Sequence, residues 1–243
     1  MPTRWPACTR EWTCGRTTSR RLQGRRKGVS NRWIVVLKVL VHAACLLPLA
    51  YLVWLFYRSA TVDPSALGPD PTSKVSLFTG FGALRLIVIS LVISPVRKLL
   101  PRLGWLIRFR RMLGLYAFAW ATLHVLAYLW LYVGWSWPAL LDDLSRRRYI
   151  WAGLTAWGLM VPLALTSTTW SIRALGGKRW NLLHRLVYVS AIAAVVHYWW
   201  IVKAGVLSPL TVTVTLGVLL LLRPFLAWWK ARRSARPATS AVA

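Results

Sequence analysis

Apolar residues gather in six long stretches that short polar segments separate. The stretches cover residues 33–57, 77–94, 112–133, 149–168, 182–201 and 207–229. At a rise of 1.5 Å per residue, each approaches or exceeds the length of about 20 residues that crosses a hydrocarbon core about 30 Å thick. None alternates apolar and polar residues as a strand does, and only helices or closed barrels span lipid. The pattern therefore predicts an all-α membrane protein, a bundle of six transmembrane helices.

Composition removes the main alternatives to a membrane protein. Apolar residues make up 57% of the chain and charged residues 15%, against roughly 45–50% and about 25% in soluble domains. This balance excludes an ordinary water-soluble enzyme. The abundance of Leu, Val, Trp and Ala excludes a disordered chain as well.

Charge is unevenly placed along the chain. The 32 Lys and Arg against 5 Asp and Glu would also suit a nucleic-acid-binding protein. Most of the basic residues, however, lie in the two tails and in segments 97–111 and 169–181, whereas the other three loops hold most of the acidic residues. By the positive-inside rule, both termini are then cytoplasmic. We interpret the charge as a topology signal and as contact with anionic membrane lipid, with no nucleic acid partner.

Three regions follow from this pattern. Residues 1–32 form a basic tail without an apolar segment, which we expect to be a disordered cytoplasmic extension. Its paired arginines resemble an export signal, but the apolar stretch that follows is long enough to remain as a span. Residues 33–229 form the six-helix domain, and residues 230–243 form a short cytoplasmic tail.

Histidine is the main chemical signal in the predicted spans. The chain has four histidines, and all lie inside apolar stretches: His42, His124, His184 and His197. Ionisable groups within a membrane are costly and usually functional. Acidic residues are nearly absent from the spans. This absence argues against a hydrolase that depends on a carboxylate and against most ion-coupled transporters. Neutral imidazole without carboxylate points to ligation of a metal or of haem.

Depth in the membrane groups these residues. His124 lies roughly 18 Å into the third stretch and His197 roughly 22 Å into the fifth, and both stretches run outward. The two are therefore predicted to hold one haem between them. His184 lies about 20 Å below His197 on the same helix, and Arg110 occupies that level on the third helix. On an ideal helix His184 and His197 point about 140° apart, so a bend or bulge is needed for both to face the bundle axis.

Several runs of sequence resemble a known family. They are RRMLGLYAFAWATLHVLAY (110–128), RRRYIWAGLTAWGLMVPLALTS (146–167), LGGKRWNLLHRLVYVSAIAAVVHYWW (175–200) and TGFGALRLIVISLVISPVRKLL (79–100). In order and spacing they resemble the MsrQ/YedZ family, the haem-binding membrane subunits of the periplasmic methionine-sulfoxide reductase system. That family belongs to the ferric-reductase-like transmembrane superfamily. The similarity covers about residues 35–230.

The resemblance implies a function and a set of site residues. It implies b-type haem held by His124, His184 and His197, and it associates FMN with the family. It also implies a bacterial inner-membrane protein that passes electrons from the respiratory quinone pool to a periplasmic molybdopterin reductase, which repairs oxidised methionines in envelope proteins. The wider superfamily has two histidines on the third helix, whereas the inner position here is Arg110. A second, inner haem would then have His184 as one ligand and Arg110 or water opposite, so the count of one or two stays open.

Each candidate residue also has a purely structural interpretation. His124 and His197 could be hydrogen-bonded core histidines, and His184 an interfacial one. His42 has no partner at its depth, which favours a packed or quinone-contacting residue. Arg110 is either a topology signal or a partner for a haem propionate, because guanidinium suits carboxylates.

Two further positions could contact a cofactor. Arg85 is predicted to face the bundle interior or to snorkel, with a haem propionate as one partner. For FMN, only the GGKR segment at 176–179 offers backbone NH groups beside cations.

Two other functions share parts of this pattern. A stand-alone transmembrane ferric or cupric reductase would share the fold and the ligands. It would normally need a cytoplasmic NAD(P)H and flavin domain, for which the tail after Trp229 is expected to be too short. A non-redox membrane scaffold or small transporter would have no need for histidines at matching depth.

Overall fold

The computed structural model describes residues 31–202 and 208–234, and within these ranges it contains helices and no strand. The helices are α1 (Asn31–Thr61), α2 (Pro71–Leu99), the 3-10 helix η1 (Pro101–Leu106), α3 (Ile107–Leu131), α4 (Trp137–Arg146), α5 (Arg148–Leu165), α6 (Thr169–Leu183), α7 (Leu186–Ile201) and α8 (Ser208–Ser234). The tails 1–30 and 235–243 and the segment 203–207 lie outside the described residues.

Five of the six apolar stretches each correspond to one helix, whereas the stretch 182–201 begins at the end of α6 and continues through α7. By length and composition, α1, α2, α3 with η1, and α8 can each cross a membrane, and α5 with α6 forms a further candidate that is bent by 107°. Helix α7 is equally apolar but has only 16 residues. The all-helical membrane fold is therefore confirmed, while the count of six spans stays a prediction.

Helix α6 replaces the loop that the sequence predicted over 169–181. The hydroxyl of Thr168 accepts a hydrogen bond from the backbone N–H of Ser171 at 3.0 Å, which caps the new helix. Side-chain capping of this kind stabilises a helix start. Gly176 interrupts α6 with a φ of +71°, a conformation that glycine adopts without strain. The prediction of an irregular loop was wrong because a capped start outweighed the basic, glycine-containing sequence.

The turn between α6 and α7 supplies the bend that is needed for both His184 and His197 to face the bundle axis. The sequence predicted one helix over 182–201, whereas the structure ends α6 at Leu183 and begins α7 at Leu186. His184 is the capping residue of α6 rather than a residue of α7. Its direction is therefore independent of that of His197.

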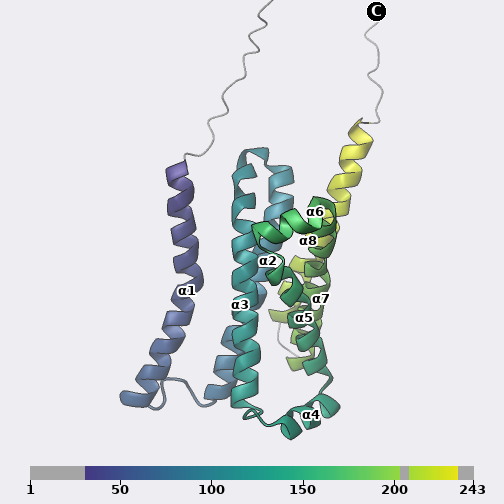
Figure 1. Ribbon diagram of the computed structural model, residues 1–243. Coiled ribbons are helices and arrows are strands. Elements are labelled where there is room, and N and C mark those ends of the chain that lie inside the picture. The colour runs from purple at the N-terminus through teal and green to yellow at the C-terminus, as the bar shows by residue number, and fades with distance from the viewer. Residues whose placement is uncertain (1–30, 203–207, 235–243) are drawn as a thin grey trace, which may run out of the picture.

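Figure 1 shows how the helices are arranged. The start of α1 and the end of α8 lie at one end of the bundle, where α6 crosses it, and α4 lies at the opposite end. We call these the terminal end and the α4 end. This arrangement agrees with two termini on one side of the membrane, which remains a prediction.

Helices α2, α3, α5, α7 and α8 enclose the core. Its fully buried members are Leu84, Ile87, Leu91, Ala117, Met160, Ala191, Val195, Tyr198, Leu216 and Leu219. Helix α1 lies to one side (Figure 1). The indole N–H of Trp120 on α3 ties it to the bundle by donating to the carbonyl of Cys45 at 3.2 Å. Gly82 allows Trp120 to pack closely, because a Cβ there would lie 2.4 Å from the indole.

Candidate functional site

Two histidines from different helices meet near the α4 end of the bundle. The ring centroids of His124 on α3 and His197 on α7 lie 6.1 Å apart, with the ring planes at 78°. The sequence predicted equal depth for these two residues, and the structure places them side by side. Two metal–imidazole bonds of about 2 Å in line, plus the two ring radii, give a centroid separation of about 6 Å. The observed spacing therefore suits one metal atom between the rings.

Each of these rings is oriented by a backbone carbonyl. Nδ1 of His124 lies 2.9 Å from the carbonyl oxygen of Ser76 on α2, and Nδ1 of His197 lies 2.6 Å from that of Tyr149 on α5. A carbonyl only accepts, so in both rings Nδ1 carries the proton. Nε2 is then the unprotonated nitrogen, which is the form that binds a metal, and a hydrogen bond from the other nitrogen is the usual support of such a ligand.

Two glycines make room for the imidazoles. A Cβ on Gly80 of α2 would lie 3.1 Å from Cε1 of His124, and a Cβ on Gly153 of α5 would lie 2.7 Å from Cε1 of His197. The second distance is shorter than side chains tolerate. Gly153 is therefore required for the position of the His197 ring, beyond any role in helix packing.

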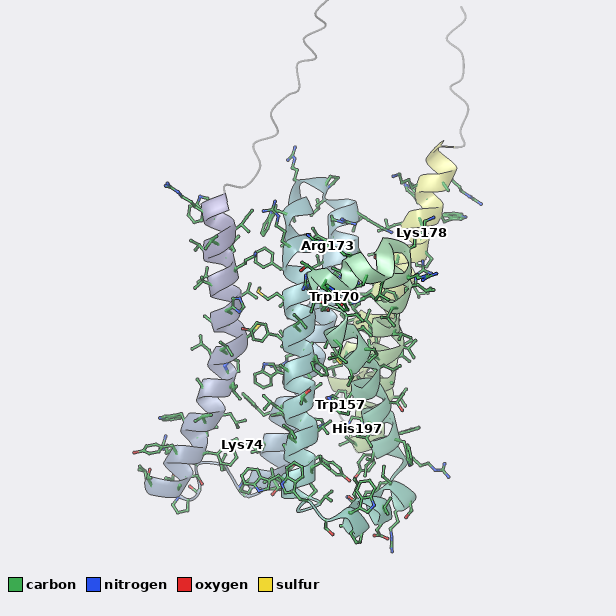
Figure 2. All side chains as sticks on the ribbon, viewed as in Figure 1. Lys74, Trp157, Trp170, Arg173, Lys178 and His197 are labelled. Carbon is green, nitrogen blue, oxygen red and sulfur yellow. The ribbon has the colours of Figure 1, made fainter. Side chains whose placement is uncertain are left out.

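A cavity of about 310 Å³ surrounds the histidine pair. Apolar side chains from α2, α3, α5 and α7 form most of its wall, including Phe81, Leu84, Val125, Leu154, Trp157 and Met160. Such a wall, with a few polar groups, is typical of a small-molecule or cofactor site. Figure 2 shows His197 and Trp157 together in the half of the bundle nearer α4, away from Arg173 and Lys178 on α6.

The donor set fits a cofactor better than a bare ion. Within residues 31–202 and 208–234, no three His, Cys, Asp or Glu side chains meet as an ion site needs. Two neighbouring imidazoles in an apolar cavity are the contribution that a protein makes to a haem, whose macrocycle supplies the remaining ligands. The residues present therefore fit haem.

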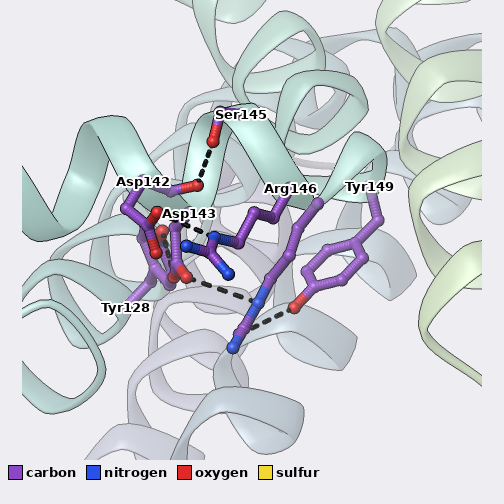
Figure 3. A network of polar contacts seen from close by, with 7 residues as sticks. Tyr128, Asp142, Asp143, Ser145, Arg146 and Tyr149 are labelled. Carbon is purple, nitrogen blue, oxygen red and sulfur yellow. Dashed lines mark hydrogen bonds and ion pairs between the residues drawn. The ribbon is translucent and has the colours of Figure 1, made fainter.

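A polar network lies beside the cavity at the α4 end (Figure 3). Asp143 of α4 accepts a hydrogen bond from the hydroxyl of Tyr128 at 3.0 Å and pairs with Nε of Arg147 at 3.3 Å. Arg147 in turn donates to the hydroxyl of Tyr149 at 3.2 Å, and this bond raises the pKa of its guanidinium. Tyr128, Arg147 and Tyr149 also line the cavity. The network thus holds the backbone whose carbonyl orients His197.

His184 lies elsewhere, near the terminal end. Its Nε2 lies 3.2 Å from the hydroxyl of Thr166, and its ring stacks on Trp180 at 3.9 Å. Arg110 is close enough to act on it electrostatically. The structure therefore brings His184 and Arg110 into one region, as predicted, but sets no second histidine opposite His184.

The remaining predicted residues take different positions. Nδ1 of His42 on α1 lies 2.5 Å from the hydroxyl of Tyr116 on α3, and this contact involves none of the other histidines. Arg85 is exposed, and its guanidinium lies over the ring of Phe81 at 5.9 Å. Of the two predicted positions, the bundle interior or an exposed, snorkelling side chain, the structure shows the exposed one.

Sequence reasoning missed two residues of these sites. Tyr149 contributes through its backbone carbonyl, which no side-chain pattern reveals. Arg223 on α8 is partly buried beside Tyr188 of α7. Its signal was present in the sequence, since it is a charged residue inside the sixth apolar stretch, where such residues are usually functional.

Comparison with known proteins identifies the family of this chain. Residues 79–195 match the family described as ferric reductase like transmembrane component. The protein-methionine-sulfoxide reductase heme-binding subunit MsrQ of Xanthomonas campestris pv. campestris (strain 8004) is 44% identical over 217 residues, which are 88% of this chain and 94% of that protein. The protein of the same name from Xanthomonas oryzae pv. oryzae (strain MAFF 311018) is 42% identical over 84% of this chain and 94% of its own. That of Azospira oryzae is 47% identical over 64% of this chain and 66% of its own.

Proposed function

Because this chain belongs to the MsrQ family of haem-binding subunits, we propose that it is the membrane electron-transfer subunit of a protein-methionine-sulfoxide reductase. It takes electrons from the quinone pool of a bacterial inner membrane. It delivers them to a periplasmic molybdopterin-containing partner, which reduces oxidised methionines. The observation that carries the proposal is the pairing of His124 with His197 at 6.1 Å.

His124 and His197 are the residues that would hold the haem iron. Both line the cavity, and the backbone carbonyls that hold their Nδ1 protons leave Nε2 unprotonated. When bound, haem supplies a centre that accepts and releases one electron at a time. The chain has no Cys-x-x-Cys-His run for covalent attachment, which supports haem of the b type.

The protein contributes a dry, shaped cavity around that centre. Apolar side chains exclude water, and a low-dielectric surrounding is one of the factors that set the potential of a haem. Gly80 and Gly153 allow close approach of the helices to the imidazoles. The Asp143–Arg147–Tyr149 network lies at the α4 end, which is the periplasmic side in the predicted topology.

A second haem near the terminal end completes an electron path across the membrane in this proposal. His184 would be its protein ligand, and Arg110 would be a second ligand or would bind a propionate. The turn between α6 and α7 places His184 outside α7, free to face the bundle independently of His197. The relevant support is that His184 and Arg110 lie within electrostatic reach of each other.

A binding site for FMN has no comparable support in the structure. The GGKR segment, residues 176–179, is exposed on α6, whereas a flavin ring needs an enclosed and largely apolar pocket. This segment does not fit a flavin site, and the proposed path makes no use of one.

Substitution of the histidines tests the proposal. We expect purified wild-type protein to show a b-type reduced-minus-oxidised spectrum that quinol can also produce. His124→Ala and His197→Ala should each lose one haem per chain. His42→Ala is the matched control, since it removes a membrane histidine outside the pair and should leave the haem content unchanged.

Two results would overturn the proposal. One is a full haem complement in both His124→Ala and His197→Ala. The other is a folded wild-type protein that contains no haem after growth with ample haem supply. In either case the pair would be a structural contact between α3 and α7.

A further inference from the structure

Arg223 of α8 is an arginine inside the bundle whose hydrogen bonding is incomplete. Its Nη2 donates to the carbonyl of Leu91 on α2 at 2.8 Å, and its Nη1 donates to the hydroxyl of Tyr188 on α7. The guanidinium also lies over the Tyr188 ring, 4.7 Å from the centroid. Its Nε is buried and has no hydrogen-bond partner within the described residues. A buried donor without an acceptor is a destabilising feature that needs an explanation.

Among the described residues, no acidic side chain pairs with Arg223. Asp63 and Asp70 lie between α1 and α2, and Asp142 and Asp143 lie on α4 at the opposite end of the bundle. The charged group that acts on Arg223 is another arginine, Arg110 of α3, whose positive charge repels it. A buried charge is usually paired, so two neighbouring cations without a carboxylate indicate that an anion belongs between them.

The surrounding contacts set Arg110 and Arg223 at one level of the bundle. Ser90 of α2 donates its hydroxyl hydrogen to the carbonyl of Arg110 at 3.4 Å, and the next residue, Leu91, accepts from Arg223. Arg110 also acts electrostatically on His184. His184 precedes Tyr188 by four residues, so the imidazole lies about one turn from the hydroxyl that Arg223 contacts. The two arginines thus adjoin the histidine of the proposed inner haem.

We infer that Arg223 and Arg110 form a site for a carboxylate at the terminal end of the bundle, and that this carboxylate is a propionate of the inner haem. Guanidinium binds carboxylates through parallel N–H donors, and Nε is one of the donors of that fork. The free Nε of Arg223 is therefore the atom that the propionate contacts. This inference rests on the proposed haem-binding function and adds a residue that the sequence resemblance did not assign.

The test uses the full-length protein in a His124→Ala, His197→Ala background, in which the remaining haem reports on the inner site alone. We expect about one haem per chain in this background. Arg223→Gln should lose that haem or shift its midpoint potential downward, because a positive charge beside the propionate favours the reduced iron. Arg223→Lys keeps the positive charge but removes the Nε donor, so its haem content should fall between those of the wild type and Arg223→Gln. Arg85→Gln is the matched control, since Arg85 is exposed on α2 and contacts only a ring face.

Three outcomes would overturn the inference. Unchanged haem content and potential in Arg223→Gln, with the protein folded by size-exclusion chromatography and circular dichroism, would remove the propionate contact. Unchanged haem together with a loss of thermal stabilisation by phosphatidylglycerol in Arg223→Gln would assign the site to a lipid phosphate instead. Absence of any haem in the histidine double variant, with one haem in the wild type, would remove the inner haem while leaving the outer one and the proposed function intact.

Discussion

His124 and His197 approach each other with both Nδ1 atoms turned outward onto carbonyls of α2 and α5. The pair therefore joins four helices, since each imidazole links its own helix to a second one. Its geometry depends on how closely these helices pack, and small residues at the contacts are the means by which membrane helices approach.

Gly153→Ala should displace the His197 ring. The new Cβ would lie 2.7 Å from Cε1 of His197, and the contact can be relieved only by moving the ring or separating α5 from α7. Disturbing the support of a metal ligand typically lowers affinity by about 10- to 100-fold, so we expect haem retention after purification to fall by at least about tenfold. Gly158→Ala on the same helix meets no atom within 4 Å and should retain haem. Equal haem content in the two variants would contradict this prediction.

Asp143→Asn should destabilise the α4 end, whereas Asp142→Asn should not. Asp143 is 18% exposed and serves both Tyr128 and Arg147, while the Asp142–Arg146 pair is open to solvent on both sides. Exposed pairs contribute about 0–1 kcal/mol. For the partly buried Asp143 we expect a loss of about 1 kcal/mol, or about 2–4 °C in melting temperature for a chain of this size. A thermal melt of both variants decides the matter, and equal melting temperatures would show that the network adds no stability.

Trp120→Phe should loosen the attachment of α1. The substitution removes the hydrogen bond to the carbonyl of Cys45, which is worth about 1 kcal/mol. A loss of that size raises the population of the open state about fivefold, so Cys45, now 5% exposed, should react faster with N-ethylmaleimide. Cys8 and Cys14 are replaced by Ser for this measurement. Trp130→Phe changes an exposed tryptophan of the same helix, α3. It should leave the rate of Cys45 labelling unchanged.

Cysteine labelling checks the orientation in the membrane. In a protein with its three native cysteines replaced by Ser, Ser145→Cys on α4 should react with a membrane-impermeant maleimide in intact spheroplasts. Lys178→Cys on α6 should react only after the membrane is opened. The reverse pattern would place the terminal end outside and would contradict the positive-inside assignment.

The hydrophobic pattern predicted the helices, and the depth of two histidines predicted their meeting, because both depend on spacing along straight helices. Helix α6 was missed, since its start relies on the local cap at Thr168 rather than on apolar periodicity. Arg85 and Arg223 show the limit most clearly. Both are arginines within apolar stretches, yet one is exposed and the other bridges α2, α7 and α8. Only the packing of the helices distinguishes them.

The acceptors that orient His124 and His197 are main-chain oxygens, at Ser76 and Tyr149. No substitution at those two positions removes the carbonyl itself. The tautomer of each histidine therefore does not depend on which side chain is present there. Mutation can alter the orientation of either ring by moving the helix that carries the carbonyl, or by placing a new atom against the ring, as at Gly153. The histidine pair should therefore tolerate substitutions of the side chains at Ser76 and Tyr149. It should be sensitive to substitutions of the small residues that allow the helices to pack closely.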